Sequence, residues 1–145
     1  MTPSTRPHGV RSREIGKQGE RAVVRALTAH GFTAAERLKA GRLVDPMDIA
    51  VCPGVLASVK AGEAAKGASL ARVVHWRECA DHNRRQAGAE LALLVVQRRG
   101  AGPANADQWR TWIIGADRDH WETTLAAACA WLHKTGWGPR DEGAP

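Results

Sequence analysis

Three short segments of the chain carry acidic and basic side chains at spacings that could support catalysis. They are Gly16-x-x-x-Glu20, Asp45-Pro46-Met47-Asp48 and Ser58-Val59-Lys60. Side chains alternate across a strand, so Ser58 and Lys60 share one face if their segment is extended. Asp48 can lie opposite them on a paired strand, and Glu20 falls on a helix that would pack beside that pair. Two acids and a lysine would then meet at one place.

Such a cluster suits the hydrolysis of a phosphodiester. Carboxylates bind Mg²⁺ through their oxygens, and the metal activates a water and neutralises charge on the phosphate. A lysine orients the nucleophile or stabilises the developing anion. Asp48 stands between Met47 and Ile49 in an apolar segment, a costly place for a carboxylate unless a charged group pairs with it. This favours a functional role for Asp48, whereas Asp45, which precedes a proline, is a turn residue or a reserve ligand.

Hydrophobic spacing predicts the elements that would position these residues. Apolar residues recur at helical spacing from Arg13 to His30, with Ser12 as the N-cap and Gly31 as the stop. The Pro53-Gly54 turn joins two apolar runs and predicts a hairpin. The first helix is therefore followed by strands over residues 32–39, 47–52 and 55–60.

The second half of the chain predicts one more helix, two strands and a final helix. We expect a loop over 62–69, a helix over 70–87, a strand over 90–97, a loop over 100–107, a strand over 109–114 and a helix over 118–134. The centre of the 90–97 strand is apolar throughout, which indicates burial on both faces. This order predicts a mixed central sheet flanked by helices, in the α/β class.

The length of 145 residues fits one domain. Residues 1–12 contain prolines and scattered charges with nothing periodic to bury, which predicts a disordered basic arm. We place a single domain over residues 13–135 and a flexible tail over 136–145. No apolar run reaches the ~20 residues of a membrane span, and the first residues do not form a secretory signal. The expected location is cytoplasmic, without a membrane partner.

The charge of the chain is unevenly distributed. The net charge is +6, and the first 25 residues hold six cations against two acids. Arginine supplies 16 of the 21 cations, which favours fork-shaped contacts with phosphate but is also what a GC-rich genome would encode. Cys52, Cys79 and Cys129 are too far apart in sequence for a disulfide framework or a zinc site, so we expect reduced core residues.

In these motifs the sequence resembles the PD-(D/E)XK nuclease superfamily, and within it the Holliday-junction-resolvase-like branch of archaea, phages and prophages. The resemblance spans residues 13–114 and lies in the Gly16/Glu20 helix, Gly31-Phe32, the 42–49 segment, Val59-Lys60 and the element order αβββαβ. It implies a restriction-endonuclease-like core with Glu20, Asp48 and Lys60 in the active site. It also places the first helix near DNA, with Arg13, Lys17, Arg21 and Arg42 as phosphate contacts.

One residue departs from the family pattern. Ser58 stands where the family usually has Glu or Gln, and a serine hydroxyl is a poor substitute for a carboxylate in binding Mg²⁺. Some restriction enzymes of the superfamily have the sequence Ser-Val-Lys at this position, and the following helix supplies the missing acid. Glu78 is the best candidate on that helix, and Glu63 is closer in sequence. If neither reaches the metal, the site would be weakened or inactive.

The resemblance implies an Mg²⁺-dependent endodeoxyribonuclease, with Mn²⁺ as a possible substitute, that cuts branched DNA as a homodimer. Asp48 and a second acid, Glu78 or Glu20, would hold the metal. Exposed faces of the 109–114 strand or of the last helix would supply the dimer surface, and a phage-encoded enzyme would work in the cytoplasm of the bacterial host. Two alternatives stay open: a degenerate module of the same fold that only binds DNA, and a nuclease that acts on ordinary duplex in restriction or repair.

Overall fold

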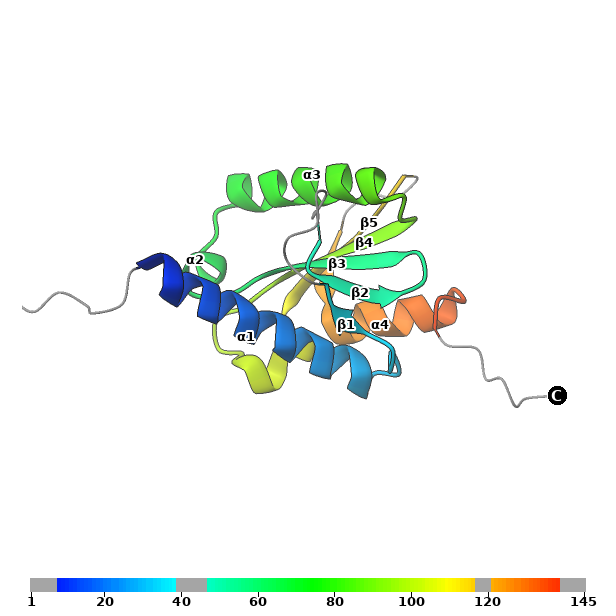
Figure 1. Cartoon of the computed structure of the whole chain (residues 1–145), viewed down its shortest axis with the longest axis horizontal. Coiled ribbons are helices and arrows are strands. Elements are labelled where there is room, and N and C mark those ends of the chain that lie inside the picture. The colour runs from blue at the N-terminus through cyan, green and yellow to red at the C-terminus, as the bar shows by residue number, and fades with distance from the viewer. Residues whose placement is uncertain (1–7, 39–46, 117–120, 139–145) are drawn as a thin grey trace, which may run out of the picture.

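A six-stranded mixed sheet carries helices on both faces (Figure 1). The computed structural model describes residues 8–38, 47–116 and 121–138, with side chains described from Arg13 onward. The strands follow the order β1-β2-β3-β4-β5-β6. The elements are α1 (His8–Ala29), β1 (Glu36–Arg37), β2 (Ile49–Cys52), β3 (Val55–Lys60), α2 (Glu63–Lys66), α3 (Leu70–Ala87), β4 (Leu91–Val96), the 3₁₀ helix η1 (Pro103–Gln108), β5 (Arg110–Gly115), β6 (Glu122–Thr124) and α4 (Leu125–Lys134).

The first helix is longer than the sequence predicts. It begins at His8, so the expectation of a disordered arm is wrong for residues 8–12, and Ser12 lies inside the helix rather than at its cap. Residues 1–7 of the predicted arm lie outside the described chain. The predicted stop is confirmed, because Gly31 adopts φ +98°, a conformation that glycine reaches without a Cβ clash.

The predicted hairpin is confirmed by the pairing of β2 and β3. These strands are antiparallel, with Ile49 opposite Ala57, and Gly54 in the connecting turn has φ +86°. The strand expected over residues 32–39 is reduced to Glu36–Arg37, because Phe32 turns into the core, where it is 1% exposed, and its carbonyl accepts from the Ala35 N–H.

The strand β4 lies at the centre of the sheet, as its apolar sequence predicts. It pairs in parallel with β3 and antiparallel with β5, and all six residues are buried. A parallel pair needs a crossover, which α2 and α3 supply. The helix α3 has the predicted bounds, with Ser69 as its N-cap and Gly88 at φ +71° after its end. The short helix α2 falls within the loop predicted over residues 62–69.

The two faces of the sheet have separate hydrophobic cores. One core includes Val23 and Leu27 of α1, Leu132 of α4, and Phe32 from the segment between α1 and β1. The other includes Met47, Val73 of α3, Leu94 and Trp112. Figure 1 shows α3 above the sheet and α1 and α4 below it.

The C-terminal third differs most from the sequence prediction. The helix expected from residue 118 begins at Leu125, with Thr124 as its N-cap, and the three residues before it form β6. The 3₁₀ helix η1 occupies most of the loop expected over 100–107. The tail expected to be flexible from Gly136 is described to residue 138, and Trp137 packs against the core. Residues 139–145 lie outside the described chain.

Two expectations about exposed and buried faces are wrong. The strand β5 has no exposed face to offer a dimer, because it lies between β4 and β6 and five of its six residues are buried. On α3, the inward residues are Val73, Ala80 and Arg84, whereas Cys79 is exposed.

The three cysteines are all free. Burial raises the pKa of the Cys129 thiol to about 12, and it also raises the pKa of half-buried Cys52. Across the described residues, none of the helices combines the length and apolar character that a membrane span requires.

Candidate active site

The carboxylate of Asp48 is fixed against β3 at the point where the hairpin ladder ends. Asp48 lies one residue before the Ile49–Ala57 pair, which places it beside Ser58. Its backbone N–H donates to the Ala57 carbonyl at 3.0 Å, and its Oδ2 accepts from the Val59 N–H at 2.7 Å. Hydrogen bonds to an ionised acceptor are short and strong. The acid therefore occupies a defined position next to the residue that precedes Lys60.

Ser58 and Lys60 share the α3 face of the sheet, as alternation along the strand predicts. Val55, Ala57 and Val59 belong to the opposite core, under α1. Ser58 is 9% exposed, so most of the residue is shielded from solvent.

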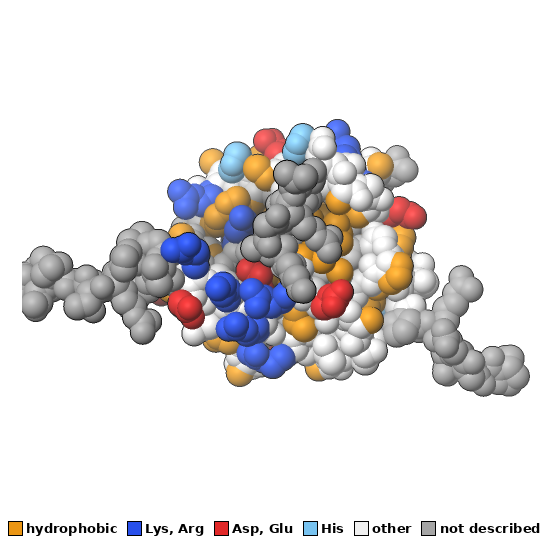
Figure 2. Space-filling model, in the orientation of Figure 1, with side chains coloured by type: hydrophobic (Ala, Val, Ile, Leu, Met, Phe, Trp, Pro, Cys, Tyr) orange, Lys and Arg blue, Asp and Glu red, His pale blue; other side chains and the backbone are white. Residues whose placement is uncertain are grey.

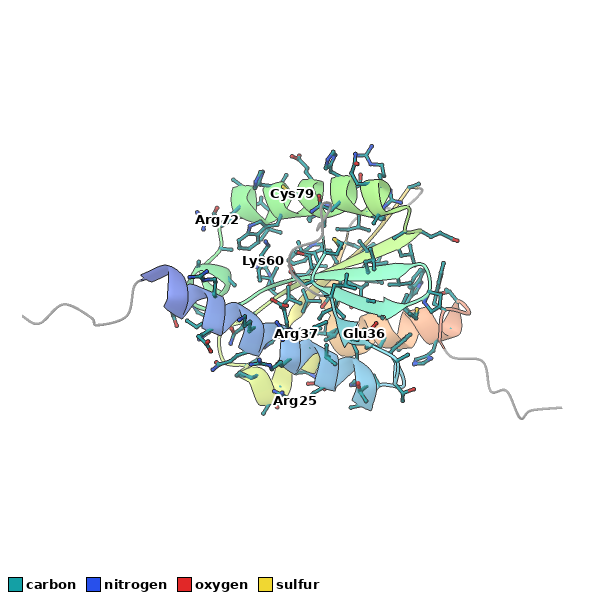
Figure 3. The ribbon with its side chains drawn as sticks, viewed as in Figure 1. Arg25, Glu36, Arg37, Lys60, Arg72 and Cys79 are labelled. Carbon is teal, nitrogen blue, oxygen red and sulfur yellow. The ribbon has the colours of Figure 1, made fainter. Side chains whose placement is uncertain are left out.

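The ammonium of Lys60 lies over an aromatic ring. Its Nζ is 5.7 Å from the ring centroid of Trp76, and the Arg72 guanidinium lies 6.0 Å from the same centroid. Figure 3 shows Lys60 between α1 and α3, with Arg72 near the start of α3. The ring face attracts cations, so Trp76 holds two positive charges beside the strand that ends at Lys60.

Glu20 reaches the same end of the sheet because α1 packs very closely there. A Cβ at Gly19 would lie 2.5 Å from the Ala61 Cβ, so only glycine allows this approach to the residue that follows Lys60. The Glu20 side chain is 19% exposed, and its Oε1 accepts from the Arg37 Nε at 3.2 Å. The ion pair orients the Glu20 carboxylate between α1 and β1.

The structure thus brings Asp48, Ser58 and Lys60 together at the end of the β2–β3 hairpin. Glu20 lies on α1, next to the glycine that contacts Ala61, the residue after Lys60. Glu78 is not with them. It is exposed and lies two residues beyond Trp76, which on an α-helix is a rotation of about 200°, away from the sheet.

Glu63, the acid closer to Lys60 in the sequence, does not join the group either. Glu63 is exposed on α2 and pairs with Lys66 at 3.2 Å and Arg99 at 3.8 Å. Arg42 and Asp45 lie outside the described residues.

The carboxylates of this region suit a hard divalent cation such as Mg²⁺ only if a substrate supplies further oxygen ligands. Within residues 8–38, 47–116 and 121–138, no group of three or more His, Cys, Asp or Glu side chains could hold a metal ion. Mg²⁺, however, usually keeps several waters and is bound through one or two carboxylates plus substrate phosphates. Asp48, fixed against β3, and Glu20, on α1, would suit that mode rather than an all-protein cage.

A row of cations follows one side of α1. Arg13, Lys17, Arg21 and Arg25 repeat at every fourth residue and all are exposed, and they span about 18 Å of the helix axis. The ion pairs formed among the described residues include none with Lys17, Arg21 or Arg25. Figure 2 shows a cluster of basic side chains on this side of the molecule. This surface, hereafter the cation row, is suited to an anionic polymer.

Sequence reasoning missed four residues around the site. Arg25 continues the spacing of Arg13, Lys17 and Arg21, so the sequence carried its signal. Arg37, Arg72 and Trp76 take part only because β1 and α3 fold against the hairpin, and no local pattern marks them.

No protein-family model matches the chain, and comparisons with curated proteins and with solved structures returned no match.

Proposed function

We propose that the protein is a metal-dependent endonuclease that hydrolyses phosphodiester bonds in DNA. The observation that carries this proposal is the fixed position of Asp48 beside the Ser58–Lys60 segment, at the sheet end that α1 approaches through Gly19. An acid, a lysine and a set of exposed arginines in one region match the needs of a phosphate-cutting site.

The topology supports the same proposal. A helix, three antiparallel strands, a helical crossover and a strand parallel to the third follow one another in the chain. This is the αβββαβ order that the resemblance to PD-(D/E)XK nucleases led us to expect. We propose that β1 to β4 with α1 and α3 form a restriction-endonuclease-like core.

In this proposal, different residues of the chain would bind the DNA, hold the metal and assist the reaction. The cation row would hold the backbone of the nucleic acid, and the ion pair with Arg37 would keep the Glu20 carboxylate in place beside β1. Asp48 and Glu20 would hold Mg²⁺ or Mn²⁺, which when bound supplies charge neutralisation at the phosphate and an acidified water. Lys60 presents its ammonium to the attacking water or to the developing charge on the phosphate, and Trp76 restrains the path of its side chain.

The substrate that we propose is branched DNA, cut by a homodimer in the cytoplasm, as for the junction-resolving branch of the superfamily. Cleavage of ordinary duplex is the alternative within the same chemistry. Of the two dimer surfaces that we expected, β5 is buried, which leaves the last helix α4. The outward residues of α4 include Ala127, Ala130 and Lys134.

A second candidate function is a DNA-binding module without catalysis. It is favoured by Ser58 at the position of the usual acid and by Glu78 on the outer side of α3. Such a module would bind DNA through the cation row, and affinity would fall steeply with salt.

Incubation of purified protein with labelled four-way junctions and with matched duplex, in Mg²⁺, in Mn²⁺ and in EDTA, tests the proposal. We expect metal-dependent cleavage that falls about 100-fold or more in Lys60→Ala and in Asp48→Asn. The control variant Lys66→Ala removes a half-buried lysine of α2 that pairs with Glu63 and should cleave as the wild type does. Absence of cleavage by the wild type in both metals, with salt-dependent binding retained, would instead establish the non-catalytic module.

A further inference from the structure

A groove beside the candidate active site is lined by residues that suit a nucleotide. It lies between α1 and β1 and has a volume of about 420 Å³, within the range of roughly 300–1,000 Å³ that ligand pockets occupy. Its lining residues are Arg21, Val24, Arg25, Ala35, Glu36 and Arg37. Figure 3 shows Glu36 and Arg37 where α1 passes β1, with Arg25 labelled below α1.

The floor of this groove is apolar and firmly supported. Val24 and Ala35 are half-buried and pack against the core under α1. An apolar floor contributes nothing to binding a bare phosphate, which needs only donors. It favours a ligand that has a flat apolar surface as well as a charge.

The rim of the groove is cationic. Arg37 is held in place by its bond to Glu20, while Arg21 and Arg25 carry no ion pair to any described residue. Guanidinium groups bind phosphate through paired N–H donors and also stack on the faces of nucleobases. Glu36 adds one carboxylate, which can accept from an N–H on the edge of an unpaired base, such as the thymine N3–H or the cytosine amino group.

We propose that this groove binds one unpaired nucleotide of a DNA substrate, with its base on the Val24–Ala35 floor and its phosphate on the arginines. Bases inside a duplex are stacked and cannot reach such a floor, so the groove selects a base that has left the stack. The inference rests on the proposed function, because it takes DNA as the partner.

The groove lies close to Glu20, so binding an unpaired base there would also affect where the DNA is cut. Arg37 lines the groove and also bonds Glu20, one residue from the contact between Gly19 and Ala61. A nucleotide bound in the groove therefore fixes the distance from the unpaired base to the bond that is cut.

Binding in EDTA, where no cleavage occurs, tests the inference by fluorescence anisotropy. The probes are a fully paired duplex and the same duplex with a single unpaired thymidine. We expect the wild type to bind the bulged duplex roughly 10-fold more tightly, which is the scale of one stacked base. Ala35→Phe fills the groove and should remove this preference while leaving affinity for the paired duplex unchanged. Ala87→Phe, at the exposed end of α3, is the matched control and should keep the preference for the bulged duplex.

A photo-crosslink keeps the test decisive if Ala35→Phe does not fold. With 5-iodouracil at the unpaired position, wild-type protein should crosslink within residues 21–25 or 35–37, as read by mass spectrometry. Equal affinity for the two probes, or a crosslink to another segment, would overturn the groove assignment while DNA binding stands. Failure to bind either probe would overturn the proposed function itself.

Discussion

Two glycines of α1 allow a matched test of how closely this helix approaches the sheet. Gly16 has nothing within 4 Å of the position that a Cβ would take, whereas a Cβ on Gly19 would lie 2.5 Å from the Ala61 Cβ and 3.6 Å from the Val59 Cγ1. The Ala61 Cβ is attached directly to backbone and cannot rotate away. Alanine at position 19 must therefore push α1 away from the end of β3.

The magnitudes follow from two opposing effects. Glycine to alanine within a helix gains about 1 kcal/mol through helix propensity at either position. Overpacking a well-packed contact costs about 1–3 kcal/mol, and only Gly19→Ala incurs it. The two variants should therefore differ in their free energy of unfolding by about 1–3 kcal/mol, with Gly16→Ala the more stable. For a chain of this size, each 1 kcal/mol moves Tm by about 2–4 °C.

Urea denaturation followed by circular dichroism measures this difference. The double variant Gly19→Ala/Ala61→Gly removes the atom that the new Cβ meets, so it should recover most of the loss. Contacting residues of this kind typically couple by about 0.5–3 kcal/mol. The added Cβ also displaces Glu20, so we expect slower DNA cleavage by Gly19→Ala than by Gly16→Ala.

Equal stability of the two single variants would refute the close approach of α1 to β3. A loss in Gly19→Ala that Ala61→Gly did not relieve would place the conflict elsewhere on α1.

Two further predictions concern α3 and the cysteines. Arg84 is buried, donates to Asp81 Oδ1 at 2.8 Å and also bonds the Ala89 carbonyl, so Asp81→Ala should lower the free energy of unfolding by about 2 kcal/mol; an unchanged urea midpoint would contradict this. In the native protein at pH 8, a thiol reagent such as DTNB should label exposed Cys79 first and Cys129 only after unfolding, since burial raises the pKa of the Cys129 thiol to about 12 and keeps it protonated; rapid native labelling of Cys129 would contradict its burial.

The elements that the sequence predicted well are those with strong local signals. The β2–β3 hairpin has an apolar run on each side of Pro53-Gly54, and its antiparallel pairing is confirmed. The 70–87 helix begins after Ser69 and ends before Gly88, which the structure shows as its caps. The strand β4 is apolar along its whole length and is buried along its whole length.

The elements that escaped prediction depend on distant partners. The strand β6 is three residues long and forms because Arg110, Thr111 and Trp112 of β5 offer an open edge, with Arg110 also paired to Glu122 at 2.8 Å. On α3, Cys79 was expected in the core but is exposed, as are the apolar residues Leu70 and Val74. Arg84 is instead buried, through bonds to Asp81 and to backbone carbonyls. The hydrophobicity of the side chains alone does not show which residues of α3 pack against the sheet.

The candidate site shows the same division. Alternation along a strand was enough to place Ser58 and Lys60 on one face and Asp48 beside them, and the structure agrees. The partners that fix these groups, Arg37 for Glu20 and Trp76 for Lys60, come from elements whose docking angle the sequence does not specify.

The number of acids at the hairpin end bears directly on whether the protein cuts DNA or only holds it. The Asp48 carboxylate already satisfies the Val59 N–H, so its presence is explained even without a metal, and Ser58 adds no charge. A carboxylate oxygen that accepts one hydrogen bond still has capacity to ligate, and Mg²⁺ commonly takes its remaining ligands from water and from the substrate phosphate. The groove and the cation row would deliver that phosphate to Asp48 and Glu20. Under the proposed function, with no third acid grouped with them among the described residues, Asp48 and Glu20 would bind a metal only together with DNA, and the small number of acids does not by itself argue against cleavage.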